Sequence, residues 1–135
     1  MSVHVRLRLG AEEYALPVEH VLEVVDLGEL AAVPGAPATV LGIRNLRGQI
    51  LPVYDLAALF RVEGGPAPAR VVVAEDGDRR VGLAVDGVTD VSDLPEPGEE
   101  AQSEFLRGAT LVDEGLVGVV DVPRLLDALE GREAS

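Results

Sequence analysis

The chain has 135 residues and a formal net charge of −13 at pH 7, because 24 acidic side chains stand against 11 basic ones, all of them arginine. Such a surface repels phosphate, which argues against nucleic-acid binding and against direct insertion into an anionic membrane. A hydrophobic content of 47% argues against disorder, and the absence of cysteine excludes disulfides, thiolate catalysis and cysteine metal sites. No stretch has the apolar run of a signal peptide or a membrane helix, so we expect a cytoplasmic protein.

Short strands dominate the predicted elements. In the first of them, apolar residues at 3, 5, 7 and 9 alternate with polar ones at 4, 6 and 8, which is typical of a half-buried strand. The other strands are predicted where short valine-rich or β-branched runs are bounded by glycine and proline. The predicted strands cover residues 3–9, 14–18, 21–26, 41–46, 49–54, 70–75, 80–85 and 116–120.

Turns, caps and two short helices complete the prediction. Arg47 and Gly48 lie between two strands and predict a hairpin turn, since glycine tolerates a positive φ. Asp55 predicts the cap of a helix over 56–60, and a second helix is expected over 121–131, with Pro123 in its first turn. Residues 61–69 read as a linker, and the acidic stretch 93–103 as an exposed loop. Many short strands with little helix favour an all-β architecture of small barrels.

The sequence also repeats itself at an offset of 66 or 67 residues. Residues 13–21 align with 80–88, residues 51–56 align with 117–122, and Gly42 falls at the place of Gly108. The alternative is a chance likeness among short valine-rich strands. We interpret the chain as a duplicated β-unit, with subdomains at about 10–63 and about 70–122 joined by the linker 61–69.

Residues suited to catalysis or metal binding are scarce. His4 and His20 lie on separate elements and make a poor zinc site, which normally needs three or four convergent ligands, so we expect two solvated histidines. There is no Gly-x-Ser-x-Gly motif, and a phosphate loop ending in lysine is impossible without lysine. We therefore expect no enzymatic activity, no cofactor and no metal.

Acidic side chains gather in one part of the sequence and leave one alternative open. They could bind a divalent cation or serve as acid and base in a small enzyme. A solvated acidic face explains them as well, and it is the interpretation that so negative a chain favours. The residues are Asp86, Asp90, Asp93, Glu96, Glu99 and Glu100.

The stretch 42–56 places the guanidinium of Arg47 beside a glycine turn. In so acidic a chain Arg47 should find a carboxylate, and bidentate pairing is the strong geometry for that contact. Such a pair could simply join two elements of the fold. It could equally form the polar edge of a partner-binding surface, because arginine is enriched at interface hot spots.

Residues 45–56, Asn-Leu-Arg-Gly-Gln-Ile-Leu-Pro-Val-Tyr-Asp-Leu, resemble the Asn-Leu-Arg-Gly-x-Ile-x-Pro-Val-x-Asp-Leu signature of the CheW family of chemotaxis coupling (scaffold) proteins. Further stretches are similar to that family in the same order and cover nearly the whole chain. They are Tyr-x-Leu-Pro-Val at 14–18, Val-x-Glu-Val at 21–24, Val-Pro-x-Ala-Pro at 33–37, Val-Gly-Leu-x-Val-Asp-x-Val at 81–88 and Asp-Val-x-x-Leu-Leu at 121–126.

The resemblance implies a single CheW-like domain over 1–135, built from two intertwined SH3-like five-stranded β-barrels. It implies a non-enzymatic adaptor, located at receptor arrays, that couples the cytoplasmic tips of methyl-accepting chemotaxis receptors to the histidine kinase CheA. In the family the receptor's helical hairpin lies in an apolar groove between the barrels, and the kinase's own CheW-like regulatory domain makes contact barrel against barrel. The family's receptor-contact residues match Glu23 and Arg47, with Asn45 and Leu46 as motif neighbours.

One residue departs from the family pattern. Arg44 stands where the family usually has a small or apolar residue, so the local surface gains a charge. The alternative function is therefore a divergent CheW-like protein that binds receptors but not the kinase, in a non-flagellar chemosensory pathway.

Overall fold

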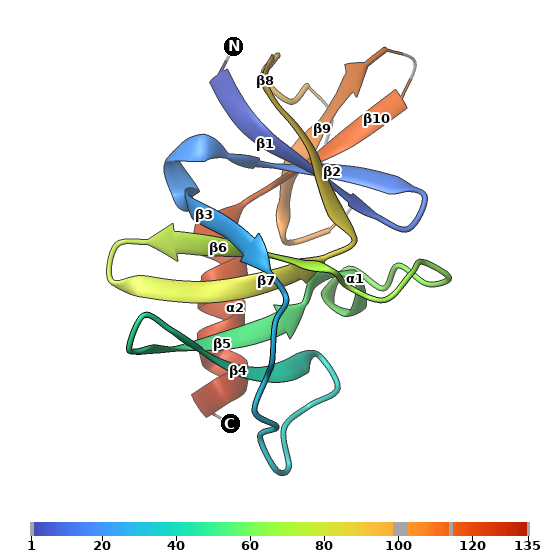
Figure 1. Cartoon of the computed structure of the whole chain (residues 1–135). Coiled ribbons are helices and arrows are strands. Elements are labelled where there is room, and N and C mark those ends of the chain that lie inside the picture. The colour runs from blue at the N-terminus through green and yellow to red at the C-terminus, as the bar shows by residue number, and fades with distance from the viewer. Residues whose placement is uncertain (1, 99–102, 114, 135) are drawn as a thin grey trace.

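The computed structural model of this chain describes residues 2–98, 103–113 and 115–134 (Figure 1). Within these residues ten strands form two five-stranded sheets, so the prediction of an all-β fold with two five-stranded units is confirmed. Sheet A has the order β8-β1-β2-β10-β9, and sheet B has the order β3-β6-β7-β5-β4. In the described residues, main-chain pairing does not join the two edge strands of either sheet, so neither is closed into a barrel by backbone hydrogen bonds.

The bounds of the elements follow the predicted strands closely, with two additions. Sheet A contains β1 (Ser2–Leu9), β2 (Glu12–Pro17), β8 (Gly87–Leu94), β9 (Leu106–Val112) and β10 (Gly115–Val120). Sheet B contains β3 (Val21–Asp26), β4 (Val40–Leu46), β5 (Gln49–Asp55), β6 (Arg70–Asp76) and β7 (Arg79–Val85). The helices are η1 (Val18–His20), α1 (Leu56–Leu59) and α2 (Val122–Ala134).

The internal repeat is visible in the strand order. Each of β1 to β5 corresponds to the strand five places later, from β6 to β10. When every strand is exchanged for its counterpart, the order of sheet A becomes the order of sheet B. The sheets nevertheless exchange strands, since β2 pairs with β10 and β5 pairs with β7, both in parallel. The expected subdomains of about 10–63 and about 70–122 therefore do not coincide with the sheets. The linker 61–69 joins α1 to β6, so it connects two strands of sheet B and does not join one sheet to the other. An offset in sequence shows repetition without showing which copies pair.

Strands β8 and β9 were not predicted. The expected loop 93–103 was wrong at its start, because Leu94 ends β8 and is buried against Ala15 and Val117. Asp90 and Asp93 point outward on β8, which is an edge strand, and charged side chains at an edge discourage pairing with other chains. The acidic residues of β8 therefore made this stretch resemble a loop in the sequence, although it forms a strand. Residues 99–102 of that expected loop lie outside the described residues.

The largest core cluster lies between the sheets and under α2. Helix α2 buries Val122, Leu125, Leu126 and Leu129, the spacing of one helical face. Asp121 caps it by accepting a hydrogen bond from the Arg124 main-chain N–H at 3.1 Å, as Asp55 caps α1. Because α2 follows the last strand of sheet A and packs on β6, it connects the two sheets (Figure 1).

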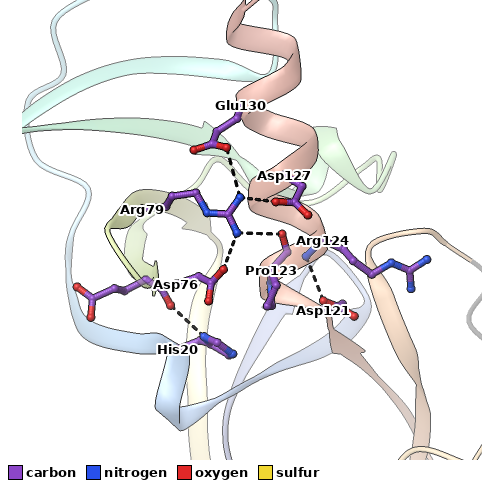
Figure 2. Close-up of polar contacts among 9 residues, drawn as sticks. His20, Asp76, Arg79, Asp121, Pro123, Arg124, Asp127 and Glu130 are labelled. Carbon is purple, nitrogen blue, oxygen red and sulfur yellow. Dashed lines mark hydrogen bonds and ion pairs between the residues drawn. The ribbon is translucent and has the colours of Figure 1, made fainter.

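A charged cluster fastens α2 to sheet B. The guanidinium of Arg79, at the start of β7, donates to Asp76 at 2.5 Å, to Asp127 and to Glu130 at 3.4 Å (Figure 2). Its side chain is only 24% exposed. Hydrogen bonding to Asp76 and then Asp127 raises the pKa of Arg79 further above its ordinary value. One cation thus holds three carboxylates together at the junction of hairpin and helix.

Replacing Arg79 by methionine is expected to lower the free energy of unfolding by about 1–2 kcal/mol, because three carboxylates would be left repelling one another. Urea unfolding at low ionic strength measures the loss, and added salt should shrink it by screening the repulsion. The control is Arg80→Met, since Arg80 pairs with Glu75 at 2.6 Å away from the helix. Equal losses in both variants would show that the cluster does not hold α2.

Candidate functional site

The β4–β5 hairpin carries the residues that the sequence singled out. Arg47 and Gly48 have φ values of 51° and 83° and form the hairpin turn, as predicted. The Asn45 side-chain oxygen accepts a hydrogen bond from the main-chain N–H of Gly48 at 3.0 Å. Asn45 therefore supports the turn, which holds the Arg47 side chain at the tip of the hairpin.

Arg47 binds Glu23 of β3 through both terminal nitrogens, Nη1 to Oε1 at 3.2 Å and Nη2 to Oε2. The expectation that Arg47 finds a carboxylate is confirmed. The side chain of Arg47 is 66% exposed and that of Glu23 is 25% exposed. Pairs at such exposure contribute little to stability, so stability alone gives a weak account of this one. The pair also links β3 to the turn that follows β4, and β3 and β4 are the two edges of sheet B.

Beside this pair lies a hollow of about 630 Å³, here called hollow B. Its walls come from β3, the β4–β5 hairpin and the β6–β7 hairpin. Ile50 is 73% exposed there, and Leu22 is also exposed. Exposed apolar side chains rimmed by charge are a feature of protein-binding surfaces. The lining residues are Leu22, Leu46, Arg47, Gln49, Ile50, Leu51, Gly77, Asp78 and Arg80.

The structure thus brings Glu23, Leu46 and Arg47 together at hollow B, whereas Asn45 turns toward Gly48. All of the lining belongs to sheet B and its hairpins. Two hollows have walls from both halves of the fold: one of about 200 Å³ includes His20, Arg107 and Asp121, and one of about 560 Å³ includes Gly10, Asp86 and much of the segment 55–68. The resemblance implies a groove between the barrels, and hollow B is not that groove, since its whole lining lies on sheet B and its hairpins.

A second hollow of about 400 Å³, here called hollow A, lies on sheet A. At the repeat offset its Leu116 matches Ile50, and Leu116 is likewise exposed, at 64%. The charge is reversed at one matched position, where Glu13 in hollow A stands at the place of Arg80 in hollow B. Sequence reasoning missed hollow A, although the offset and the apolar residue in the second hairpin were visible signals.

The histidines differ from expectation. His4 is 2% exposed, so the prediction that it is solvated is wrong, because Ala15, Leu94 and Val117 form a core on the inner side of sheet A. One ring nitrogen, Nδ1, contacts the Ser2 carbonyl oxygen at 2.8 Å. His20 is half-buried and contacts the carbonyl oxygen of Glu75 at 3.0 Å.

The acidic stretch gives no metal site within the described residues. In the described residues, histidine and carboxylate side chains do not gather in groups of three or more that could hold a metal ion. Asp86 instead accepts a hydrogen bond from the Gly10 main-chain N–H at 2.6 Å. Glu99 and Glu100 lie outside the described residues. Across the described chain, too, no helix has the length and apolar character needed to cross a bilayer.

The duplicated sheets, each with an open hollow that has an exposed apolar side chain in its lining, define a small β-sheet domain of two repeated units. The chain belongs to the CheW family: the model of the CheW-like domain matches residues 4–130. The predicted resemblance is confirmed.

Several known proteins are similar to the chain over most of its length. The chemotaxis protein CheW of Klebsiella aerogenes is 33% identical, over 90% of this chain and 80% of that protein. Protein FrzA of Myxococcus xanthus is 31% identical, over 93% of this chain and 85% of FrzA. The crystal structure of the scaffolding protein TtCheW from Thermoanaerobacter tengcongensis superimposes on this chain with a TM-score of 0.81 and is 28% identical in sequence. The match covers 90% of this chain and 84% of TtCheW. The chain is thus a CheW-like scaffold protein of chemotaxis-type signalling.

Proposed function

We propose that this protein is a non-enzymatic adaptor that couples the cytoplasmic tips of methyl-accepting chemotaxis receptors to the regulatory domain of a CheA-type histidine kinase. The observation that carries the proposal is the Glu23–Arg47 pair at the rim of hollow B, beside exposed Leu22 and Ile50. We place the protein in the cytoplasm, at receptor arrays.

Hollow B suits one face of a helical hairpin such as a receptor tip. Its volume of about 630 Å³ accepts apolar side chains from a turn of helix, with the remainder of the helix lying on the rim. A helix that docks in a groove takes its affinity from apolar burial and its register from a few charges. Glu23 and Arg47 supply one charge of each sign for that register.

Hollow A is the surface we assign to the kinase. The regulatory domain of the kinase is itself CheW-like, so it should present a pair of related hollows. Hollow A carries Glu13 and Leu116, whereas hollow B carries Arg80 and Ile50. Glu13 of one domain could therefore meet an arginine at the place of Arg80 in the other, and exposed apolar side chains at the two rims could pack together, which supports contact barrel against barrel.

Co-purification with the receptor tip and with the kinase regulatory domain, each tested alone, decides the proposal. Ile50→Asp and Leu116→Asp are a matched pair, since both side chains are exposed and occupy the same place in the repeat. We expect Ile50→Asp to lose the receptor tip and keep the kinase domain, and Leu116→Asp to do the reverse. Absence of binding to either partner by the unaltered protein would refute the adaptor function.

The second candidate is a protein that binds receptors but not the kinase, in a non-flagellar pathway. It is left open by Arg44, which puts a charge where the family usually has a small or apolar residue. Binding of the receptor tip alone, with no kinase contact at either hollow, would select this alternative.

A further inference from the structure

The two edges of sheet B face each other across a seam with little main-chain pairing. Strands β3 and β4 stand at opposite ends of the strand order. The segment after β3 runs down toward β4 (Figure 1) and meets it at Ala31 and Ile43, which exchange hydrogen bonds of 2.9 Å and 2.8 Å. Under the seam lies an apolar core of sheet B, against which Leu27 and Leu46 pack.

Arg44 of β4 reaches across this seam to the end of β3. Its Nη1 donates hydrogen bonds to the main-chain oxygen of Asp26 and to that of Leu27, the latter at 3.0 Å. Charged donors make stronger hydrogen bonds than neutral ones, so each of these bonds should be stronger than a main-chain hydrogen bond in a turn. Arg47, three residues further along the same hairpin, holds Glu23 three residues earlier on β3.

The chain leaves room for this guanidinium at Gly28. A Cβ atom there would lie 3.0 Å from Nη1 and 3.1 Å from Cζ of Arg44, so a larger residue would push the guanidinium away. Gly28 also has a φ of 65°, which favours glycine. The absence of a side chain at Gly28 therefore fits Arg44 in its observed position.

Sheet A lacks the same arrangement. At the repeat offset, Thr110 stands at the place of Arg44, Asp113 at that of Arg47 and Asp90 at that of Glu23. With two acids and no arginine at these three places, sheet A cannot be fastened in this way. The arginine contacts are therefore particular to the sheet that carries hollow B.

We propose that Arg44 is a positioning residue: it holds the end of β3 against β4, which places the Glu23 carboxylate within reach of Arg47 and fixes Leu22 at the rim of hollow B. The role in recognition rests on the proposed function, in which hollow B receives the receptor tip. The role in the seam does not, and it can be measured without a partner.

The first experiment compares amide hydrogen exchange in Arg44→Met with that in the unaltered protein. Exchange at Ala31 and Ile43 is expected to be about tenfold faster once the charged donor is lost. The matched control is Arg70→Met, because Arg70 also contacts Asp26, at 3.1 Å, but through the exposed carboxylate. We expect no change in the control, and a partial return of protection in Arg44→Lys, which keeps one donor.

The second experiment measures binding to the receptor tip. Arg44→Met is expected to raise the dissociation constant about threefold to tenfold, and to add nothing in an Arg47→Met background if it acts through that pair. Unchanged exchange at Ala31 and Ile43 would overturn the seam role, and additive losses of binding would overturn the positioning of Glu23. If the unaltered protein does not bind the tip, the proposed function fails, while the exchange rates still decide the role of Arg44 in the seam.

Discussion

Replacing Glu23 by arginine is expected to weaken binding of the receptor tip by about 10- to 100-fold, because like charges brought together at an interface cost several kcal/mol. Adding Arg47→Glu restores opposite charges and should recover part of the loss. Calorimetric titration with the receptor's helical hairpin measures both constants. The observed bidentate contact between the two side chains is the reason to expect coupling between them.

The matched control for this reversal is Glu13→Arg, which changes the net charge equally but lies in hollow A, paired with Arg6. We expect it to leave receptor binding within about twofold, since hollow A and hollow B lie on different sheets and share no lining residue. Losses that simply add in the double variant would mean that Glu23 and Arg47 do not act together in recognition.

Replacing Gly42 by alanine is expected to lower the free energy of unfolding by about 3 kcal/mol or more. The cost has two parts, which are the strain of a positive φ in a residue other than glycine and a steric clash of the new Cβ atom with the main chain. Gly42 has a φ of 153°, and a Cβ atom there would lie 2.6 Å from the main-chain oxygen of Ala31 and 3.1 Å from Cβ of Leu30. Backbone atoms cannot move aside as a flexible side chain can. The seam beside Arg44 would have to open.

Gly35→Ala is the control for this variant, since Gly35 has a φ of 76° but open space around its Cα. It should cost only about 1 kcal/mol, the price of left-handed backbone alone. Urea unfolding of both variants at one temperature gives the comparison. If the two losses agree, backbone conformation explains Gly42 and the close approach to Ala31 does not.

Local features of the fold could be predicted from the sequence because they depend on residues close together in the chain. Asp55 and Asp121 each accept a hydrogen bond from a main-chain N–H three residues further on, and Gly48 follows Arg47 in a tight turn. These signals need no knowledge of the remainder of the molecule. The order of the family motifs was equally readable, since it is a property of the sequence.

Features that depend on distant residues could not be predicted in this way. The alternation in residues 3–9 correctly predicted β1, yet it suggested a polar face for His4, which the structure buries inside sheet A. The offset of the repeat suggested two consecutive units, whereas β2 pairs with β10 and β5 with β7. Hollow A and the hold of Arg44 on β3 likewise appeared only once the strands were placed.

The amino-acid sequence by itself therefore determined eight of the ten strands in the described residues, the β4–β5 turn, the helix caps and the family of this protein. Tertiary structure decided which strands are neighbours, which faces are covered and which charges meet. The physical reason is that every strand presents the same main-chain donors and acceptors, so hydrogen bonding alone does not choose its partner. That choice is made by side chains far apart in the sequence, such as Glu23 and Arg47, once packing has brought them together.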